Sequence, residues 1–471
     1  MNEMRPDTFD ENAKAALQDE VLRGALTKAT GLFGERRTAA VEEVPDWEPL
    51  RERARQVKEE VLAHLDEYLP RFVMNAERQG IVVHWARDAK EACQVVVDLA
   101  TARGVKTVVK SKSMTTEEIH LNAALEREAV EPVETDLGEW IIQLAGETPS
   151  HIIVPAIHKT KRQVAELFTE KIGIPATDDE KELTRCARDV LRARFAEADM
   201  GISGANFAIA ETGSILLLEN EGNIRLTTSL PRFHLAVLGI EKIIPTLADL
   251  AAFLRLLPRS GTGQHLTSYQ SILSGPRRDG DTEGPEEVHV LLLDNGRSRM
   301  LRERVTRQSL ACIRCGACLN ACPVYQQVGG HAYGSVYPGP IGAIITPQLS
   351  GLHKAAQLPY ASSLCGACRQ VCPVKIDIPE LLLHLRHRIA SGEGLPGSDV
   401  PGRPLLERFG FKLWAWAMRG PRRYRIANRL LRWLAPLRVG PVRAWTAARD
   451  LRPPAKRTFR DAWRDGIEDP S

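Results

Sequence analysis

Apolar and charged positions alternate at helical spacing through the first part of the chain. The stretches Pro49–Arg53 and Val61–Leu65 show this pattern clearly. Apolar side chains that recur every three or four positions form one face of an amphipathic helix. The pattern therefore predicts an N-terminal helical segment, residues 1–75, that covers a larger domain.

Between residues 76 and 296, short apolar runs alternate with helical stretches. Strands that alternate with helices indicate an α/β domain built on a mainly parallel sheet. Two of the strands are joined only through Thr212-Gly213, which is typical of a hairpin, so we expect the sheet to be mixed. The expected strands are Gly80–His84, Val105–Lys110, Glu139–Leu144, His151–Ala156, Phe207–Glu211, Ser214–Glu219 and Val288–Leu293, and the expected helices are Ala89–Ala102, Thr116–Glu126, Gln163–Thr169 and Asp178–Glu197.

Two further regions follow this domain. A helix from about Ser298 to Ser309 is predicted to lead into a cysteine-rich domain, residues 297–395, with more helical segments after Asp377. Residues 396–471 form a tail rich in Pro and Arg.

Composition is that of an ordinary soluble globular protein. The chain has 471 residues, of which 43% are hydrophobic and 26% are charged, and this length allows two or three domains. A chain of this size buries a sizeable core without metals, so we expect any cluster to serve chemistry. No apolar run approaches the roughly 18 residues of a membrane-spanning helix, and the polar N-terminus lacks the apolar core of a secretory signal. Most of the nine cysteines gather in one place, which favours metal ligation in a reducing compartment and predicts a cytoplasmic protein.

Seven cysteines between residues 312 and 372 form two related motifs. Within each motif, two residues separate successive cysteines except before the last one, where the spacing is three residues. A proline follows the last cysteine of each motif. In proteins with two clusters, this spacing turns three thiolates around one iron–sulfur cube and sends the last cysteine to the other cluster. Gly316 and Gly366 each follow a ligand cysteine and allow backbone N–H groups to approach the cluster sulfurs. The motifs are Cys312-x2-Cys315-x2-Cys318-x3-Cys322-Pro323 and Cys365-x2-Cys368-x3-Cys372-Pro373.

The crossed pattern predicts a first cluster held by Cys312, Cys315, Cys318 and Cys372, and a second held by Cys322, Cys365 and Cys368. The second site is one cysteine short, and Ser362 stands where the missing cysteine is expected. Three outcomes are open: a 4Fe cluster with another fourth ligand, a 4Fe cluster with an exposed iron, or a 3Fe cluster. Ser362 is a candidate ligand, although its hydroxyl is much harder to deprotonate than a thiol.

Zinc sites and buried free thiols are the alternatives to clusters. Zinc usually takes paired C-x2-C units with four ligands per metal, which fits two Cys-Pro-terminated runs badly. Cys93 and Cys186 stand alone in helical stretches and are interpreted as small core residues. The gap of 42 residues between Cys322 and Cys365, with helical flanks, resembles the α-helical ferredoxin domain of respiratory iron–sulfur subunits.

Two segments of the α/β region, Gly146–Lys159 and Gly204–Ser214, resemble the lactate-utilization (LUD) domain. The cysteine motifs, Ala311–Pro323 and Leu364–Pro373, are similar to those of the iron–sulfur subunit of the three-component bacterial L-lactate oxidation system. The resemblance extends from about residue 50 to the tail and holds in domain order and motif spacing.

This resemblance implies an α/β fold akin to ribose-5-phosphate isomerase and CoA-transferase domains, followed by an α-helical ferredoxin domain. It also implies an electron-transfer role in oxidising L-lactate to pyruvate, and so in growth on lactate, together with two partner subunits. In that family the seven matching cysteines hold two [4Fe–4S] clusters in the crossed pattern. The missing eighth cysteine is therefore expected as a family feature.

Two basic loops are candidates to bind a small carboxylate such as lactate. Lys110-Ser111-Lys112-Ser113 closes a predicted strand, and His158-Lys159 follows another. Strand–loop–helix junctions place N–H groups and positive charge where an anion can sit. The alternative interpretation is two solvated basic loops.

Glu211 and Thr212 form a third candidate, in the predicted turn. The carboxylate is suited to act as a base or to contact a ligand, and equally to orient the turn through backbone N–H groups. No G-x-G-x-x-G follows a strand, so no hydride acceptor is evident. Lactate oxidation releases two electrons, so we expect another centre or subunit to take part.

The tail carries 17 Lys and Arg against six Asp and Glu from Pro401 onward. Trp alternates with basic residues in Phe411–Trp416, Tyr424–Trp433 and Val442–Trp445. These features fit helices packed over the cluster domain, a docking surface for a partner subunit, or an interfacial helix at the inner face of a membrane. Nucleic-acid binding is not expected, because no recognised module accompanies the charge.

The sequence thus leads to two functions of different classes. The first is an electron-transfer subunit of an L-lactate-oxidising complex, and the second is a self-sufficient isomerase- or transferase-type enzyme with structural clusters. A third hypothesis is an iron–sulfur scaffold or sensor without turnover. Whether the chain alone is an enzyme stays open at this stage.

Overall fold

The structure is a computed structural model that describes residues 5–395, 400, 402–434, 455 and 458–466. The chain divides into two compact units, residues 1–401 and 402–471, and each unit is described by itself. No helix within these described ranges is long and apolar enough to cross a membrane.

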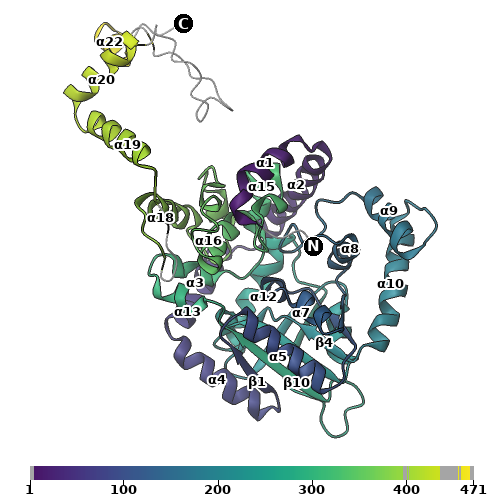
Figure 1. The fold of residues 1–471 in the computed structure, drawn as a ribbon. Helices are drawn as coiled ribbons and strands as arrows, with labels where there is room; N and C mark the ends of the chain where they lie inside the picture. Colours follow the sequence, from purple (N-terminus) through teal and green to yellow (C-terminus); the bar gives the residue numbers. More distant parts are fainter. Residues whose placement is uncertain (1–4, 396–399, 401, 435–454, 456–457, 467–471) are drawn as a thin grey trace. The chain divides into compact units, whose positions relative to one another are not determined.

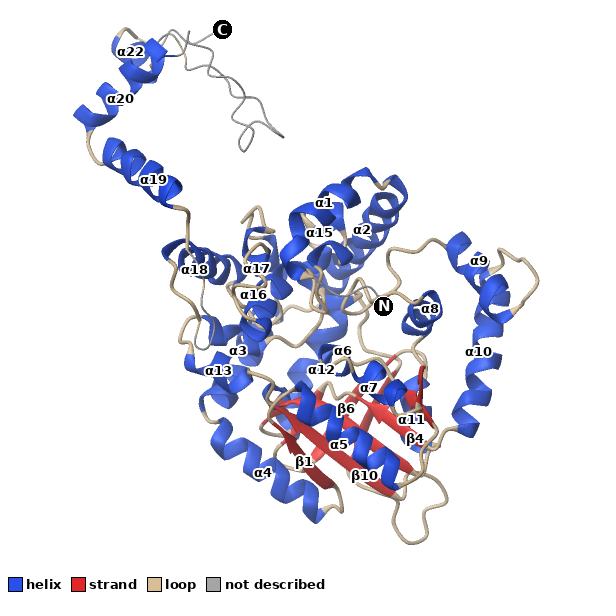
Figure 2. Ribbon diagram, viewed as in Figure 1, coloured by secondary structure: helices blue, strands red, loops and turns tan. Residues whose placement is uncertain are grey.

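A six-stranded sheet forms the centre of the first unit (Figure 2). Every pairing in it is parallel, which confirms the parallel α/β arrangement expected from the alternation of strands and helices. The middle strands are buried along nearly their whole length, as expected for a sheet covered on both faces. The strand order is β1 (Val82–Ala86), β10 (Glu287–Leu293), β7 (Phe233–Gly239), β4 (Met200–Ser203), β2 (Thr107–Lys110) and β3 (Glu131–Glu134).

Helices cover both faces of this sheet. Helix α5 (Ala89–Ala102) crosses one face in front of β1 and β10 (Figure 1). The Asp88 side chain caps its first turn by accepting the Glu91 N–H at 2.9 Å, and Ala92, Val96 and Ala100 form its buried stripe. The other face, near β3, packs against α8 (Leu137–Ala145), α9 (Lys161–Ile172) and α10 (Glu180–Glu197).

A second sheet contains the predicted hairpin. Its order is β8 (Ile243–Ile244), β5 (Phe207–Ile209), β6 (Ser214–Glu219) and β9 (Tyr269–Leu273). Strands β5 and β6 pair antiparallel, which confirms the hairpin, but the mixed sheet is this second one and not the central sheet. The turn needs Gly213, because its φ is +71° and an added Cβ would lie 2.1 Å from the Ala76 backbone nitrogen.

The N-terminal helices connect the α/β part with the cysteine region. Helices α3 (Trp47–Ala63) and α4 (Leu65–Arg78) pack against the second sheet, and α12 (Leu247–Gly261) packs against α3. Helices α1 (Phe9–Gln18) and α2 (Glu20–Glu42) pack beside α15 (Tyr325–Val328) of the cysteine region (Figure 1). Helices therefore make up most of the chain from Pro6 to Arg78.

The cysteine region is helical and shares its apolar core with the second sheet and the N-terminal helices. A buried ion network also joins it to the α/β part: Arg297 pairs with Glu118 at 2.8 Å and with Glu241 at 2.5 Å, and the Tyr337 hydroxyl donates to Glu118 at 2.6 Å. The elements are α13 (Arg297–Arg302), η3 (Thr306–Ala311), α14 (Ala317–Asn320), α15 (Tyr325–Val328), η4 (His331–Tyr333), α16 (Gly339–Ser350), η5 (Leu358–Tyr360), α17 (Ala367–Val371) and α18 (Ile378–Ser391).

Two expected strands are wrong. Glu139–Leu144 belongs to α8, which begins where the Asp136 side chain accepts the Glu139 N–H at 3.1 Å; a short apolar run fits a buried helix as well as a strand. His151–Ala156 forms turns instead of a strand, because the His151 Nδ1 accepts the Ile153 and Val154 N–H groups at 3.0 and 3.2 Å.

Two expected helices are interrupted. Thr116–Glu126 is divided between α6 (Met114–Glu118) and α7 (Leu121–Arg127), because His120 between them has a φ of +54°. The helix expected from Ser298 to Ser309 is divided into α13 and η3.

The second unit contains α19 (Leu405–Met418), α20 (Pro421–Leu434) and α22 (Phe459–Arg464). Several of its large aromatic side chains are exposed, among them Phe409, Trp414 and Trp433. Of the three Trp- and Arg-bearing segments expected here, Val442–Trp445 lies outside the described residues.

Candidate functional site

The first cysteine group lines one buried cavity. Cys312, Cys315, Cys318 and Cys372 surround it, and Ile152 of the α/β part closes one side. Three of the four thiols are 7 or 8% exposed. The structure therefore brings together the four cysteines that the crossed pattern predicts for the first cluster.

Backbone N–H groups point at the sulfurs of this first site. The Arg314 N–H donates to the Cys312 Sγ at 3.4 Å, and the Ile376 N–H donates to the Cys372 Sγ at 3.3 Å. Gly316 has a φ of +71°, and an added Cβ would lie 3.0 Å from Ile153. N–H donors of this kind stabilise cluster sulfurs and thiolates.

Several cations surround the first site. Arg51 is buried and donates to the Cys372 carbonyl oxygen at 3.0 Å. Burial raises the pKa of Cys372 to about 11, and the N–H of Ile376 and the Arg51 charge act in the opposite direction. Arg37 faces Cys372 as well. Positive charge favours the thiolate form that iron requires.

The second cysteine group is more open. Cys322 and Cys368 are buried, whereas Cys365 is exposed. Burial, followed by repulsion from Cys322, raises the pKa of Cys368 to about 12. By contrast, the Ala367 N–H and the Ser363 side chain lower the pKa of Cys365.

Ser362 occupies the same local turn as the first ligand of the other motif. Its Oγ accepts the Leu364 N–H at 3.1 Å, just as the Cys312 Sγ accepts the Arg314 N–H at 3.4 Å. Leu364 and Arg314 both have a positive φ, 56° and 60°. Arg386 also fixes the turn by donating to the Ser362 carbonyl oxygen at 2.9 Å.

The seven thiols of the two groups were compared with the ligand sets of single metal ions and of clusters. Across the described ranges, no three His, Cys, Asp or Glu side chains are arranged to hold one metal ion. The first four cysteines line one cavity, and four thiolates are the usual ligands of one iron–sulfur cube. A tetrahedral zinc site would need the thiols to converge at about 2.3 Å from one atom.

Most of the predicted anion-binding residues lie elsewhere. Lys110 is completely buried and pairs with Glu134 at 2.7 Å and Glu117 at 3.0 Å; these carboxylates raise its pKa against the effect of burial. Lys110 is therefore held in an internal ion-pair network at the edge of the sheet.

The two cysteines outside the motifs, Cys93 and Cys186, were expected to be core residues but are only half-buried.

The other two candidates are engaged in local structure. His158 and Lys159 pair with Glu147 at 2.8 and 2.7 Å, and no strand precedes them. Glu211 accepts the Leu247 N–H at 2.9 Å at the start of α12, and the Thr212 hydroxyl accepts the Ser214 N–H at 3.3 Å within the turn.

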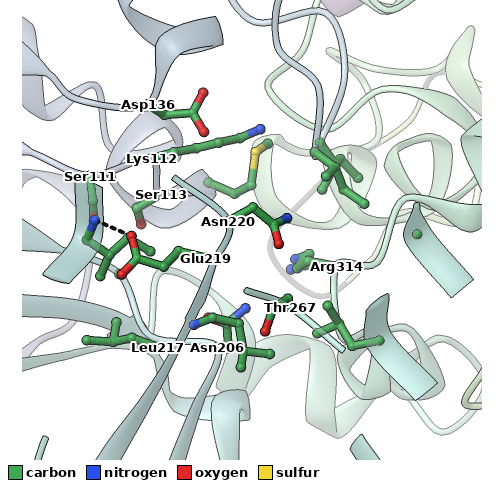
Figure 3. A pocket seen from close by; sticks show the side chains of 18 of the residues that line it. Ser111, Lys112, Ser113, Asp136, Asn206, Leu217, Glu219, Asn220, Thr267 and Arg314 are labelled. Atoms are coloured by element: carbon green, nitrogen blue, oxygen red, sulfur yellow. Dashed lines mark hydrogen bonds between the residues drawn. The ribbon is translucent and has the colours of Figure 1, made fainter. Parts of the chain in front are cut away.

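Lys112 and Ser113 do line a cavity, of about 400 Å³, at the carboxyl ends of the central strands (Figure 3). Sequence reasoning missed three other residues of this cavity, Lys242, Arg314 and Glu221. Arg314 lies between two ligand cysteines, which was an available signal. Lys242 follows β7, which was not among the expected strands, whereas Glu221 follows the correctly expected strand Ser214–Glu219 and was overlooked.

Comparison with known proteins places these sites in a family. Residues 69–293 match the LUD domain, 308–376 the 4Fe-4S dicluster domain, and 384–466 the domain described as Lactate utilisation protein B, C-terminal. The protein called Lactate utilization protein B from Bacillus velezensis is 43% identical over 97% of this chain and 96% of its own length. The protein of the same name from Bacillus subtilis is 42% identical over 98% of this chain and 96% of its own.

A solved structure of a DUF162 family protein from Deinococcus radiodurans aligns with 49% of the present chain and with 98% of its own chain. Its identity is 15% and its TM-score 0.28.

Proposed function

The chain belongs to the lactate utilization protein B family, and on that premise we propose that it is the iron–sulfur electron-transfer subunit of a complex that oxidises L-lactate to pyruvate. In this role it supports growth on lactate. A chain that carries electrons needs clusters close together, and at least one cluster within reach of a partner.

The observation that carries this proposal is the pair of cysteine groups within one compact unit. The first group lines a buried cavity next to the α/β part, and the second includes the exposed Cys365. Clusters used only as structural staples would have no need of an exposed ligand.

We assign two [4Fe–4S] clusters to these groups. Cys312, Cys315, Cys318 and Cys372 would hold the first. Cys322, Cys365 and Cys368 would hold the second, with Ser362 as the fourth group. When bound, such clusters take up and release single electrons.

The proposed chemistry needs partners. Lactate gives up two electrons and two protons on becoming pyruvate, whereas a cluster accepts one electron. We therefore propose that two other subunits complete the system and that one of them supplies the two-electron acceptor. The basic second unit, with exposed Trp414 and Trp433, is suited to dock onto a partner or a membrane surface.

Three finer expectations belong to the same proposal. The α/β domain, residues 76–296, would be related to ribose-5-phosphate isomerase and CoA-transferase domains. It would be flanked by the helical segment 1–75, the ferredoxin domain 297–395 and the tail 396–471. The complex would work in the cytoplasm, at or near the inner face of the membrane.

Cluster bleaching tests the proposal. The full chain, purified without oxygen, should keep its visible cluster absorbance when L-lactate is added alone. It should bleach when lactate is added together with the partner subunits. Bleaching by lactate alone would contradict the role of a subunit and would show that the chain is itself a lactate-oxidising enzyme.

The alternative, a self-sufficient isomerase- or transferase-type enzyme, is favoured only by the cavity at the carboxyl edge of the sheet. It predicts turnover that survives Cys365→Ser with the fold intact. Turnover that disappears with the second cluster would exclude it.

A further inference from the structure

The cavity with Lys112 lies where ligands bind in open α/β sheets. Strand β2 lies between β3 and β4. The connection after β2 therefore leads to the neighbour on one side, β3, and the connection after β3 leads back to the neighbour on the other side, β4. The cavity is lined by residues that follow these strands, namely Lys112, Asp136 and Asn206. Ligands of parallel sheets collect at the carboxyl ends of strands at such a reversal.

Two cationic side chains reach this cavity from opposite sides (Figure 3). The Lys112 Nζ and the Arg314 Nη1 are both buried, and neither has a hydrogen-bond partner among the described residues. The Arg314 side chain is only 9% exposed, and its other terminal nitrogen, Nη2, lies 3.5 Å from the Glu241 carboxylate. A buried donor without a partner costs about 1–3 kcal/mol, and more when it is charged. This cost would be relieved by an anion between the two groups.

The acidic residues of the cavity are already committed to the backbone. Glu219 accepts the Ile224 N–H at 2.6 Å and the Arg225 N–H at 2.9 Å at the start of α11 (Asn223–Ser229). Asp136 accepts the Glu139 N–H at 3.1 Å. Glu221, the third acidic residue of the cavity, accepts the Leu137 N–H at 3.0 Å. None of these three carboxylates forms an ion pair with Lys112, so this cation stays available.

The cavity also borders the first cysteine site. Ile152 lines both, and Arg314 lies between Cys312 and Cys315. An added Cβ on Gly261, which lines the cavity, would lie 2.8 Å from the Cys315 carbonyl oxygen. A molecule in the cavity would therefore be separated from the first cysteine site only by the residues that border both, such as Ile152.

We propose that this cavity binds a short-chain 2-hydroxy- or 2-oxocarboxylate, with the carboxylate held between Lys112 and Arg314. The choice of acid rests on the proposed role in lactate oxidation, whereas the choice of an anion rests on the unpartnered Lys112 Nζ and Arg314 Nη1 atoms. The volume of about 400 Å³ admits acids longer than lactate, so the assignment is to the class of acid.

Calorimetric titration of the anaerobically purified full chain tests the site. L-Lactate and pyruvate should bind to the wild type, and Lys112→Met should weaken both at least about tenfold, as expected for loss of a charge-assisted hydrogen bond. Lys159→Met is the matched control, because Lys159 pairs with Glu147 outside the cavity, and it should bind like the wild type. Equal affinity of Lys112→Met and the wild type would overturn the proposal.

Lactamide, an uncharged analogue, separates charge recognition from shape. It should not bind measurably, and lactamide binding as tight as that of lactate would overturn the assignment of an anion. A second readout is the EPR signal of the reduced protein, which lactate should perturb in the wild type and leave unchanged in Lys112→Met. A signal indifferent to lactate in the wild type would overturn the placement beside the first site.

The outcomes separate this site from the proposed function. Normal iron and sulfide content without any acid binding would overturn the site alone. Acid binding by a chain that cannot hold iron would instead overturn the electron-transfer role and leave the site standing.

Glu221 predicts a pH dependence of this binding. Burial and repulsion from Asp136 raise its pKa to about 7, opposed by the Leu137 N–H and Lys112, while Glu219 adds to the rise. Glu221 becomes negative as the pH rises through about 7, so the affinity for an anion should fall there. Glu221→Gln should flatten this profile, and an unchanged profile would show that Glu221 does not face the ligand.

Discussion

The two cysteine groups share one local design but lie in different surroundings. In both, a residue with positive φ precedes a ligand cysteine, a glycine with positive φ follows it, and a short helix begins there. The first group is enclosed between the α/β part and the N-terminal helices, whereas the second reaches the surface through Cys365. Local sequence sets the ligand turn, and packing from distant segments decides how protected each site is.

Basic side chains near the first cysteine group add to the difference in protection between the two groups. Arg37, Arg51, Lys58, Lys242 and Arg314 all act electrostatically on thiols of the first group. Cations that surround a buried cluster offset the cost of placing its negative charge in the core. On the proposed assignment, the first site is therefore suited to retain a cluster, and the second is accessible to other molecules through Cys365.

Removal of one ligand from each group should have the largest effect. Cys318→Ser should abolish the first cluster and lower the thermal midpoint, because it leaves a buried hydroxyl in the shared core. Cys365→Ser should lose only the second cluster and keep the midpoint within a few degrees. Iron analysis and thermal unfolding measure both, and an equal loss of stability in the two variants would break the comparison.

Thiol alkylation of the iron-free chain should separate the groups next. Cys365 is exposed and its pKa is lowered, so its reaction rate with iodoacetamide should rise with pH and level off at a lower pH than that of an unperturbed thiol. Cys368, with a pKa of about 12, should react on the order of a thousandfold more slowly at neutral pH. Mass spectrometry reads each site, and circular dichroism checks that the iron-free chain is folded. Labelling of Cys368 as fast as Cys365 would show that the second site is not organised as described.

Ser362 allows the incomplete site to be repaired. Ser362→Cys should give the second cluster a full set of thiolates and slow its loss to a chelator severalfold. Ser362→Ala should have the opposite effect and favour a 3Fe cluster. EPR of the oxidised protein detects the 3Fe form, and identical chelation rates in all three proteins would show that Ser362 plays no part in holding the cluster.

A smaller effect is expected from the cations of the first site. Arg37→Met removes a positive charge that faces Cys315 and Cys372, so the first cluster should become harder to reduce. An interaction of about 1 kcal/mol corresponds to a shift of roughly 40 mV to more negative potential. Arg23→Met is a control on the same helix, and a redox titration followed by EPR measures the shift. No difference between the two variants would weaken the role assigned to charge.

The sequence was sufficient for features whose signal is local. The cysteine spacing placed the ligand turns, and the periodicity of Ala89–Ala102 predicted α5 with the bounds that the structure has. It was insufficient where a long-range partner decides. Lys110 and Lys112 look equally suited to bind an anion in the sequence. In the fold, however, Lys110 lies directly opposite Glu134 in the neighbouring strand and forms a buried ion pair with it.

That neighbouring strand, β3, was not recognised, because Pro132 and two glutamates interrupt its apolar pattern. The turn of His151–Ala156 was also out of reach, since a buried histidine organises it by bonding to Asn320 of the cysteine region at 3.1 Å. The cavity depends on both segments. For this reason Lys112 was predicted together with anion-binding candidates that lie outside the cavity. Arg314, which lines the cavity with Lys112, was not predicted at all.

EPR of the anaerobically purified chain, oxidised and after reduction by dithionite, tests the central claim most directly when combined with iron and sulfide analysis. We expect about eight iron and eight sulfide per chain and two interacting [4Fe–4S]⁺ signals after reduction. A chain that binds zinc and no sulfide, or that shows a single isolated cluster signal with about four iron per chain, would contradict it.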